Sequence, residues 1–89
     1  MRRPPEHFGD DELDLIYIAK RLGEAKKLEQ VLTNGSIEYL VTADYYIGGV
    51  IFRKARIGAF FYVRATDSER ARSLLERHGY RPLELEEPE

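Results

Sequence analysis

Several residue types are absent or scarce in this chain, and each absence excludes a class of protein. The 89 residues contain no cysteine, so disulfide bonds and thiolate metal sites are excluded. No apolar run approaches the roughly 18 residues that a membrane-spanning helix needs. Residues 1–5 (MRRPP) lead into no apolar stretch, so we expect neither a membrane anchor nor a signal peptide. The absence of cysteine is compatible with a reducing cytoplasm, which is the location that we expect.

Groups that could carry catalysis or hold a metal are also scarce. The two histidines, His7 and His78, lack the spacing of metal ligands. No serine has a histidine base placed near it by the sequence, and Gly48-Gly49 is only a glycine pair, not a phosphate-binding or dinucleotide-binding motif. We therefore expect no catalytic residue, no metal and no cofactor, and the sequence predicts a protein that is not an enzyme.

The composition indicates one small domain. The chain is 43% hydrophobic and 34% charged, which allows a compact but thin core. A thin core favours self-association, because an interface buries further apolar surface. The net charge of −2 argues against a general nucleic-acid binder.

The apolar pattern predicts six elements in the order β-α-β-β-α-β. Apolar residues at helical spacing define two helices, which end at Gly35 and Gly79. Pro82 lacks an amide donor, so the last strand has to lie at a sheet edge. The predicted strands cover residues 13–19, 37–41, 59–63 and 80–85.

This order predicts an α+β fold of the ferredoxin-like βαββαβ type. Such a fold has a four-stranded antiparallel sheet, two helices on one face and, here, a long loop between the second and third strands. We expect a mobile N-terminal tail (residues 1–12), the ferredoxin-like domain (residues 13–85) and an acidic C-terminal tail (residues 86–89).

Two helices cover one face of such a sheet, so the other face needs a different cover. If Phe61 and Val63 lie under the helices, neighbouring aromatic residues lie on the open face, where soluble monomers rarely expose a large apolar patch. We expect a homo-oligomer, a dimer or a trimer; the alternative is that the long loop folds back as a lid. The expected sheet-face or interface residues are Tyr17, Tyr39, Phe60 and Tyr62.

The 17 residues from 42 to 58 are the best candidate for a functional segment. Hairpin loops usually have about 2–5 residues, and longer loops are often functional. Guanidinium groups beside mobile backbone amides suit a small anionic ligand, and the apolar side chains suit a protein partner. A third interpretation is a long β-ribbon with its turn at Gly48-Gly49 and solvated cations. The candidate contact residues are Tyr45, Tyr46, Gly48, Gly49, Arg53, Lys54 and Arg56.

Residues 43–49 and 58–63, with the Gly35-Ser36-Ile37 entry into the second strand, resemble a family of short prokaryotic proteins classed as signal-transducing. The likeness covers roughly residues 15–81. That family is similar in fold to the nitrogen-regulatory PII proteins, βαββαβ trimers with a long functional loop between the second and third strands.

The PII motifs for nucleotide binding are not matched here, so only the fold and the position of the loop are implied. The resemblance implies a bacterial regulatory or interaction protein that contacts a protein partner or a small anionic ligand with residues 42–58.

RNA-recognition domains are the alternative class. Residues 15–22 resemble their first-strand motif, and residues 58–64 loosely resemble the third-strand motif, whose aromatic side chains stack on bases. The aromatic residues do not have the spacing that the third-strand motif requires (F-x-F-V), and the chain has a net negative charge. Binding of single-stranded RNA through the sheet aromatics is therefore the alternative function.

Overall fold

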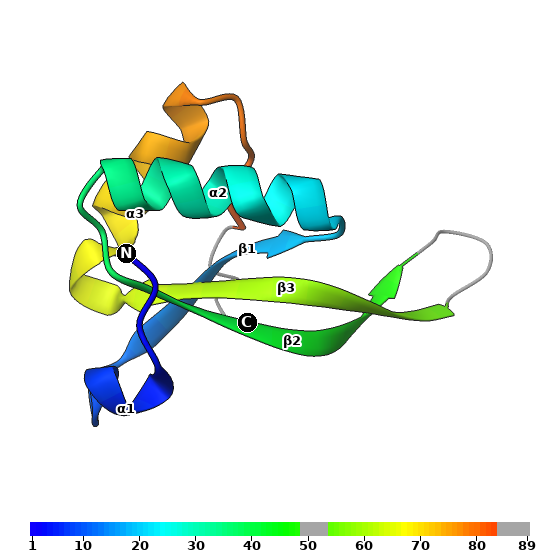
Figure 1. Ribbon diagram of the computed structural model, residues 1–89, viewed down its shortest axis with the longest axis horizontal. Helices are drawn as coiled ribbons and strands as arrows, with labels where there is room; N and C mark the ends of the chain where they lie inside the picture. The colour runs from blue at the N-terminus through cyan, green and yellow to red at the C-terminus, as the bar shows by residue number, and fades with distance from the viewer. Residues whose placement is uncertain (49–53, 84–89) are drawn as a thin grey trace, which may run out of the picture.

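Three antiparallel strands form the centre of the molecule. The computed structural model describes residues 1–48 and 54–83. Here β1 (Leu13–Ala19), β2 (Tyr39–Gly48) and β3 (Lys54–Arg64) form one sheet in the order β1-β3-β2. The helices α2 (Leu22–Asn34) and α3 (Ser68–Arg77) cover one face, and the short α1 (Pro5–Phe8) lies on the opposite side (Figure 1). A 3₁₀ turn, η1 (Ala65–Asp67), joins β3 to α3.

The prediction of a four-stranded, ferredoxin-like sheet is wrong: in the described part of the chain the sheet has three strands. Residues 80–83 of the predicted last strand follow α3 as irregular chain. One backbone hydrogen bond, from Leu83 N–H to the Ile16 carbonyl at 2.7 Å, joins them to β1. Pro82 has no amide to donate, so the ladder does not continue there. Glu84, Leu85 and the predicted acidic tail (residues 86–89) lie outside the described residues.

The predicted long loop between the second and third strands is also wrong. β2 and β3 stay in continuous antiparallel register from the pair Tyr39–Val63 to the pair Gly48–Lys54. Residues 49–53, between the two strands, are not among those described. Residues 42–48 and 54–58 thus form the β-ribbon of the third interpretation, which projects beyond the start of α2 (Figure 1). Its predicted turn at Gly48-Gly49 is wrong, because Gly48 is still paired with Lys54. Binding of a protein partner or a small anionic ligand by this segment stays a prediction.

The core lies between the sheet and the two long helices. The apolar stripes predicted to face the sheet were Leu28, Val31 and Leu32 in the first long helix and Leu74 and Leu75 in the second. Leu28, Leu32 and Leu75 are fully buried, as predicted, whereas Val31 and Leu74 are only partly buried against the core. Phe61 and Val63 of β3 are buried in the same core, as predicted. The other buried members of this core are Ile16, Ala19, Ala25, Ile37, Tyr39 and Ala71.

A bulge in β1 explains why two consecutive residues of this apolar strand lie on the same side. The register with β3 shifts between Leu15 and Tyr17, so Ile16 is an extra residue in the strand. As a result Ile16 and Tyr17 both pack against the helix-side core.

The N-terminal segment, residues 1–12, lies along the outer edge of β2. Arg2 forms a parallel bridge with Tyr39, whose N–H donates to the Met1 carbonyl and whose carbonyl accepts from Arg3 N–H. Phe8 is 2% exposed, with the Arg64 guanidinium 4.8 Å from the centre of its ring. The segment that we expected to be a mobile tail thus packs on the domain, and its motion in solution stays a prediction.

Candidate functional site

Large apolar side chains are exposed at the end of the molecule where the ribbon passes the start of α2. Leu22 is 73% exposed, Tyr45 68% and Ile57 62%. Tyr45 and Ile57 are opposite each other in the β2–β3 register, and so point to the same face of the ribbon. This is the helix-covered face of the sheet. Tyr45 and Ile57 are nevertheless exposed, because the ribbon extends past the N-terminal end of α2 (Figure 1).

A shallow groove of about 310 Å³ lies beside these side chains. Its apolar floor comes from small residues of β1, α2 and the ribbon, and Leu22 and Ile57 lie at its border. We call Leu22, Tyr45, Ile57 and the lining of this groove the ribbon surface. The remaining lining residues are Arg2, Ala19, Lys20, Arg21, Ala25, Val41, Thr42, Ala43, Gly58 and Ala59.

The charged residues in the groove lining all have the same sign. Arg2, Lys20 and Arg21 line it, and no carboxylate from the described residues does. Arg2 has a long ion-pair distance of 3.8 Å to Glu29. The two nearest acidic groups in sequence are engaged with backbone: Glu24 accepts from Lys20 N–H and Asp44 accepts from Tyr45 N–H. The ribbon surface is therefore apolar with a basic margin.

The opposite face of the ribbon is packed more closely. The Tyr46 ring lies over Gly58, where an added Cβ would be 3.0 Å from Tyr46 Cε1 and 2.9 Å from Ile18 Cγ2. The Lys20 ammonium lies 5.8 Å from the centre of the Tyr46 ring, at the range of a cation–π contact. Tyr46 thus covers part of the sheet face that the helices leave open.

The predicted loop residues separate onto the two faces of the ribbon. Tyr45 belongs to the ribbon surface, whereas Tyr46 and the exposed Arg56 are paired on the other face. Gly48 and Lys54 form the last pair of the ribbon. Gly49 and Arg53 lie outside the described residues.

The four aromatic residues expected on the open sheet face are also divided. Tyr17 and Tyr39 lie on the helix-covered side instead, where Tyr17 packs edge-on against Tyr80 and the Tyr39 hydroxyl donates to Glu29 Oε1 at 3.1 Å. Burial raises the pKa of both hydroxyls. Phe60 and Tyr62 do lie on the other face, but Phe60 is only 9% exposed. This face therefore offers little free aromatic surface, and its role as an interface stays a prediction.

Sequence reasoning missed Leu22, Ile57 and Arg21. Leu22 precedes Ala25 by three residues and so continues the apolar stripe of the helix, a pattern that indicates burial. Its exposure follows from the position of the first turn of α2 relative to the sheet. Ile57 continues the alternation of Phe61 and Val63, and a longer strand assignment would have placed it on their face.

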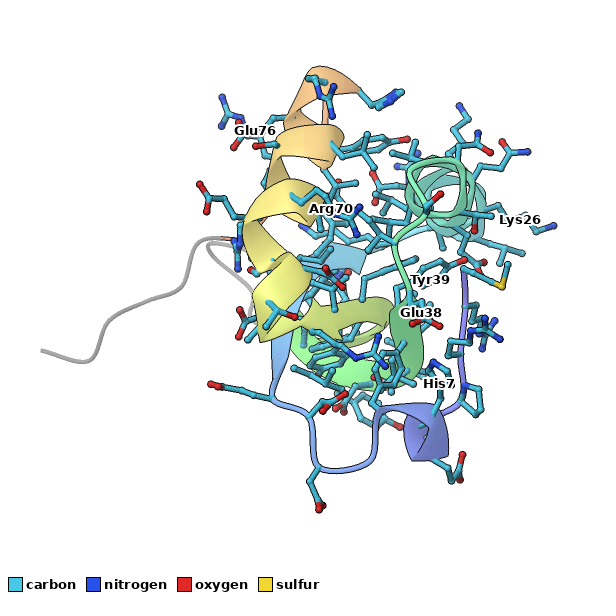
Figure 2. The ribbon with its side chains drawn as sticks, turned by 90° about the vertical axis from the view of Figure 1, so that its left-hand side faces the viewer. His7, Lys26, Glu38, Tyr39, Arg70 and Glu76 are labelled. Atoms are coloured by element: carbon cyan, nitrogen blue, oxygen red, sulfur yellow. The ribbon has the colours of Figure 1, made fainter. Side chains whose placement is uncertain are left out.

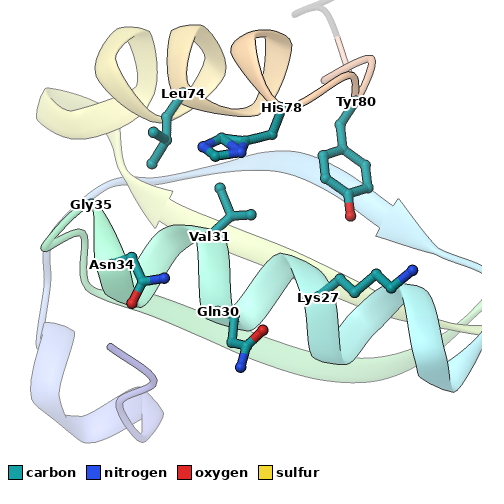
Figure 3. Close-up of a pocket in the computed structure, with 8 residues that line it drawn as sticks. All are labelled: Lys27, Gln30, Val31, Asn34, Gly35, Leu74, His78 and Tyr80. Carbon is teal, nitrogen blue, oxygen red and sulfur yellow. The ribbon is translucent and has the colours of Figure 1, made fainter.

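A second groove, of about 380 Å³, lies between α2 and α3 (Figure 3). Val31 and Leu74 form its apolar part, and exposed polar side chains of both helices surround it. Gly35 lies directly against Leu74, so closely that a Cβ added at Gly35 would collide with the leucine side chain. None of the described residues places a buried polar group in this groove, so we attribute it to helix packing. The polar residues around it are Lys27, Gln30, Asn34 and His78.

The strongest cluster of charges surrounds Glu38, at the start of β2 and beside α1 (Figure 2). Arg64 Nη1 donates to Glu38 Oε1 at 2.8 Å, and Arg3 Nε donates to Oε2 at 2.7 Å. His7 Nε2 lies 2.7 Å from the same oxygen. Arg64 and then Arg3 lower the pKa of Glu38 to about 2. The cluster joins the N-terminal segment to the sheet, so we interpret it as structural.

Within residues 1–48 and 54–83, no group of three or more His, Cys, Asp or Glu side chains is placed to hold a metal ion. None of the helices described is both long and apolar enough to span a membrane. Comparisons of the chain with protein-family models, curated proteins and solved structures found no match. The likeness to PII-like signal-transducing proteins therefore stays a prediction, and the class that the fold defines is a small α+β protein with a projecting β-ribbon.

Proposed function

We propose that this protein is a non-catalytic interaction domain that binds an acidic partner protein through the ribbon surface. The observation that supports this most is where exposure is concentrated. Leu22, Tyr45 and Ile57 are the three most exposed large apolar side chains in the described chain. Leu22 and Ile57 line the same groove, and Tyr45 is paired with Ile57 in the ribbon. Exposed apolar residues are ordinary when scattered, but a contiguous group marks an interaction site.

The charges around the groove indicate the kind of partner. In the part of the chain that the structure describes, Arg2, Lys20 and Arg21 line it without a carboxylate, although the full sequence carries a net charge of −2. Complementary charge guides association and suppresses wrong partners. A partner that presents apolar residues together with Asp or Glu would complement this surface.

Other parts of the expectation remain proposals. They are a regulatory role in a bacterial cytoplasm and a homo-oligomer. A small anionic ligand would need the cations of the ribbon, of which Arg53 is outside the described residues. The burial of Phe60 disfavours stacking of RNA bases on the sheet.

Selection from a library of random displayed peptides tests the proposal. We expect the selected peptides to be rich in apolar and acidic residues. Their affinity should fall about tenfold or more in the variant Leu22→Ser/Ile57→Ser, since the loss of apolar anchors commonly costs at least about 1.4 kcal/mol. Leu83→Ser is the matched control, because Leu83 is also exposed but lies next to β1, at the other edge of the sheet.

The melting temperatures of both variants should stay close to that of the unchanged protein, because substitutions of exposed residues usually change stability by less than about 0.5 kcal/mol each. Peptides that bind the double variant as tightly as the unchanged protein would contradict the proposal, as would a failure to select any peptide. Salt-dependent binding of single-stranded RNA in place of peptides would support the alternative function.

A further inference from the structure

The outer edge of β2 is partly occupied by the chain itself. The Tyr39 N–H donates to the Met1 carbonyl, and the Tyr39 carbonyl accepts from Arg3 N–H. Both Tyr39 groups therefore point away from β3. Backbone groups alternate in direction along a strand, and the β2–β3 register has no shift. Val41, Ala43 and Tyr45 therefore also direct their N–H and carbonyl groups outward.

These outward groups are largely free. Within the described residues, the N–H groups and carbonyls of Val41 and Ala43 have no hydrogen-bond partner, because the N-terminal segment turns away at Pro4-Pro5. The Tyr45 N–H bonds to its neighbour's carboxylate, Asp44 Oδ1, at 2.7 Å, and its carbonyl has no described partner.

This edge also lacks the usual protection against pairing with another chain. Exposed edge strands are commonly protected by lysine, proline or a bulge. β2 (YLVTADYYIG) contains neither lysine nor proline, and its pairing with β3 shows no bulge. Asp44 is the one charged residue in the strand.

The groove of the ribbon surface lies directly beside the free stretch. Val41 and Ala43 belong to its lining, on the helix-covered face of the sheet. A strand added next to β2 would direct every second side chain to that face, and so into the groove. Charged side chains of the same strand would lie close to Arg2 and Arg21.

We infer that the partner binds as an extended, acidic and apolar peptide that adds a strand to the free edge of β2 at Val41 and Ala43. This inference rests on the proposed function and specifies its geometry. The main-chain hydrogen bonds supply affinity, and the groove supplies specificity for an apolar side chain. The basic margin excludes a second copy of the same ribbon as the favoured occupant, because like charges would face each other.

Amide hydrogen exchange measured by NMR on the free protein is the first arm of the test. The Val41 and Ala43 amides should exchange at least about 100-fold faster than those of Thr42 and Leu40, which donate to β3. Slow exchange of Val41 and Ala43 in dilute protein would overturn the inference. Slow exchange that appears only at high protein concentration would show a second copy at this edge, and would overturn it too.

The tightest peptide from the display selection is the probe in the second arm. On its addition, the Val41 and Ala43 amides should become protected about 100-fold or more. Peptides N-methylated at single positions should show a loss of affinity with a period of two along the sequence, about tenfold at alternate residues, because every second amide donates to β2. Ala43→Pro, which removes an outward donor and leaves the pairs with β3 in place, should weaken binding similarly.

The outcomes separate the inference from the proposed function. A peptide that binds through Leu22 and Ile57 without protecting Val41 and Ala43, and without the period of two, overturns strand addition and leaves the interaction domain standing. If no peptide binds, both fail. Since the N-methylated peptides leave the protein unchanged, the test holds even if Ala43→Pro does not fold.

Discussion

Gly58 offers a sharp test of how the ribbon packs on the sheet. Its backbone does not have the positive φ that favours glycine, so alanine can adopt the same conformation. The added Cβ, however, would lie 2.9 Å from Ile18 Cγ2 and 3.0 Å from Tyr46 Cε1. Carbon atoms in good contact are about 3.5–4.0 Å apart. Gly58→Ala therefore requires the Tyr46 ring or the Ile18 side chain to move.

Two effects of opposite sign decide the result. Overpacking in a closely packed site costs about 1–3 kcal/mol, whereas replacing glycine restricts the unfolded chain and contributes about 0.4–1 kcal/mol of stability. We expect Gly58→Ala to lower the free energy of unfolding by about 1 kcal/mol. In a domain of this size that lowers the melting temperature by about 4–8 °C.

Gly23→Ala is the matched control, because Gly23 lies in the first turn of α2 with no atom within 4 Å of the added Cβ. Alanine in a helix is favoured over glycine by about 0.5–1 kcal/mol, so this variant should be stabilised. Urea unfolding followed by circular dichroism measures both changes. The cost of Gly58→Ala should shrink in a Tyr46→Ala background, with a coupling of at least about 0.5 kcal/mol. If Gly58→Ala stabilises the protein as Gly23→Ala does, Tyr46 does not pack over Gly58.

The remaining predictions concern the core and the N-terminal segment. Leu32→Ala should lower the free energy of unfolding by about 2–5 kcal/mol, because Leu32 is fully buried. Leu22→Ala, at a 73% exposed leucine of the same helix, should change the free energy of unfolding by less than about 0.5 kcal/mol. Equal effects of the two substitutions in urea unfolding would mean that α2 packs through another face. Because the pKa of Glu38 is lowered to about 2 in the folded protein, its carboxylate stabilises the fold fully above its ordinary pKa of 4.5, and this contribution is lost as the pH falls from about 5 to 2. Glu38→Gln should therefore make the melting temperature depend less on pH in that range. The control Glu76→Gln, on the exposed face of α3, should show the same pH dependence as the unchanged protein. If the melting temperature of Glu38→Gln varied with pH as that of the unchanged protein does, the stabilising role of the Glu38 ion cluster would be contradicted. Phe8→Ala should lower stability by up to about 3–5 kcal/mol and speed the amide exchange of Tyr39, whose N–H bonds to Met1; an unchanged exchange rate would show that the segment stays in place without Phe8.

Local periodicity was enough to predict part of the helix-facing core. The stripe of Leu28 and Leu32 and the alternation of Phe61 and Val63 are read over a few residues, and each pattern has one face to bury. The bulge at Ile16 was not readable, because an apolar run is equally typical of a strand that is covered on both faces.

Only part of the candidate site could be predicted from the sequence. The sequence placed function in residues 42–58 and singled out Tyr45, which is on the ribbon surface. It could not distinguish a long loop from a ribbon, because strand pairing depends on a partner strand and not on either strand alone. Leu22 was not singled out from the sequence, and its exposure depends on where α2 crosses the sheet.

By itself, then, the sequence determined which residues of the two long helices and of β3 share a face, since that depends only on the 3.6-residue and two-residue repeats of the backbone. Tertiary structure alone decided that the sheet has three strands in its described part, that Arg3 and Arg64 converge on Glu38 and hold the N-terminal segment against β2, and that the edge at Val41 and Ala43 stays free. Each of these depends on contacts between segments far apart in the chain, and no local pattern encodes which distant segment will lie alongside.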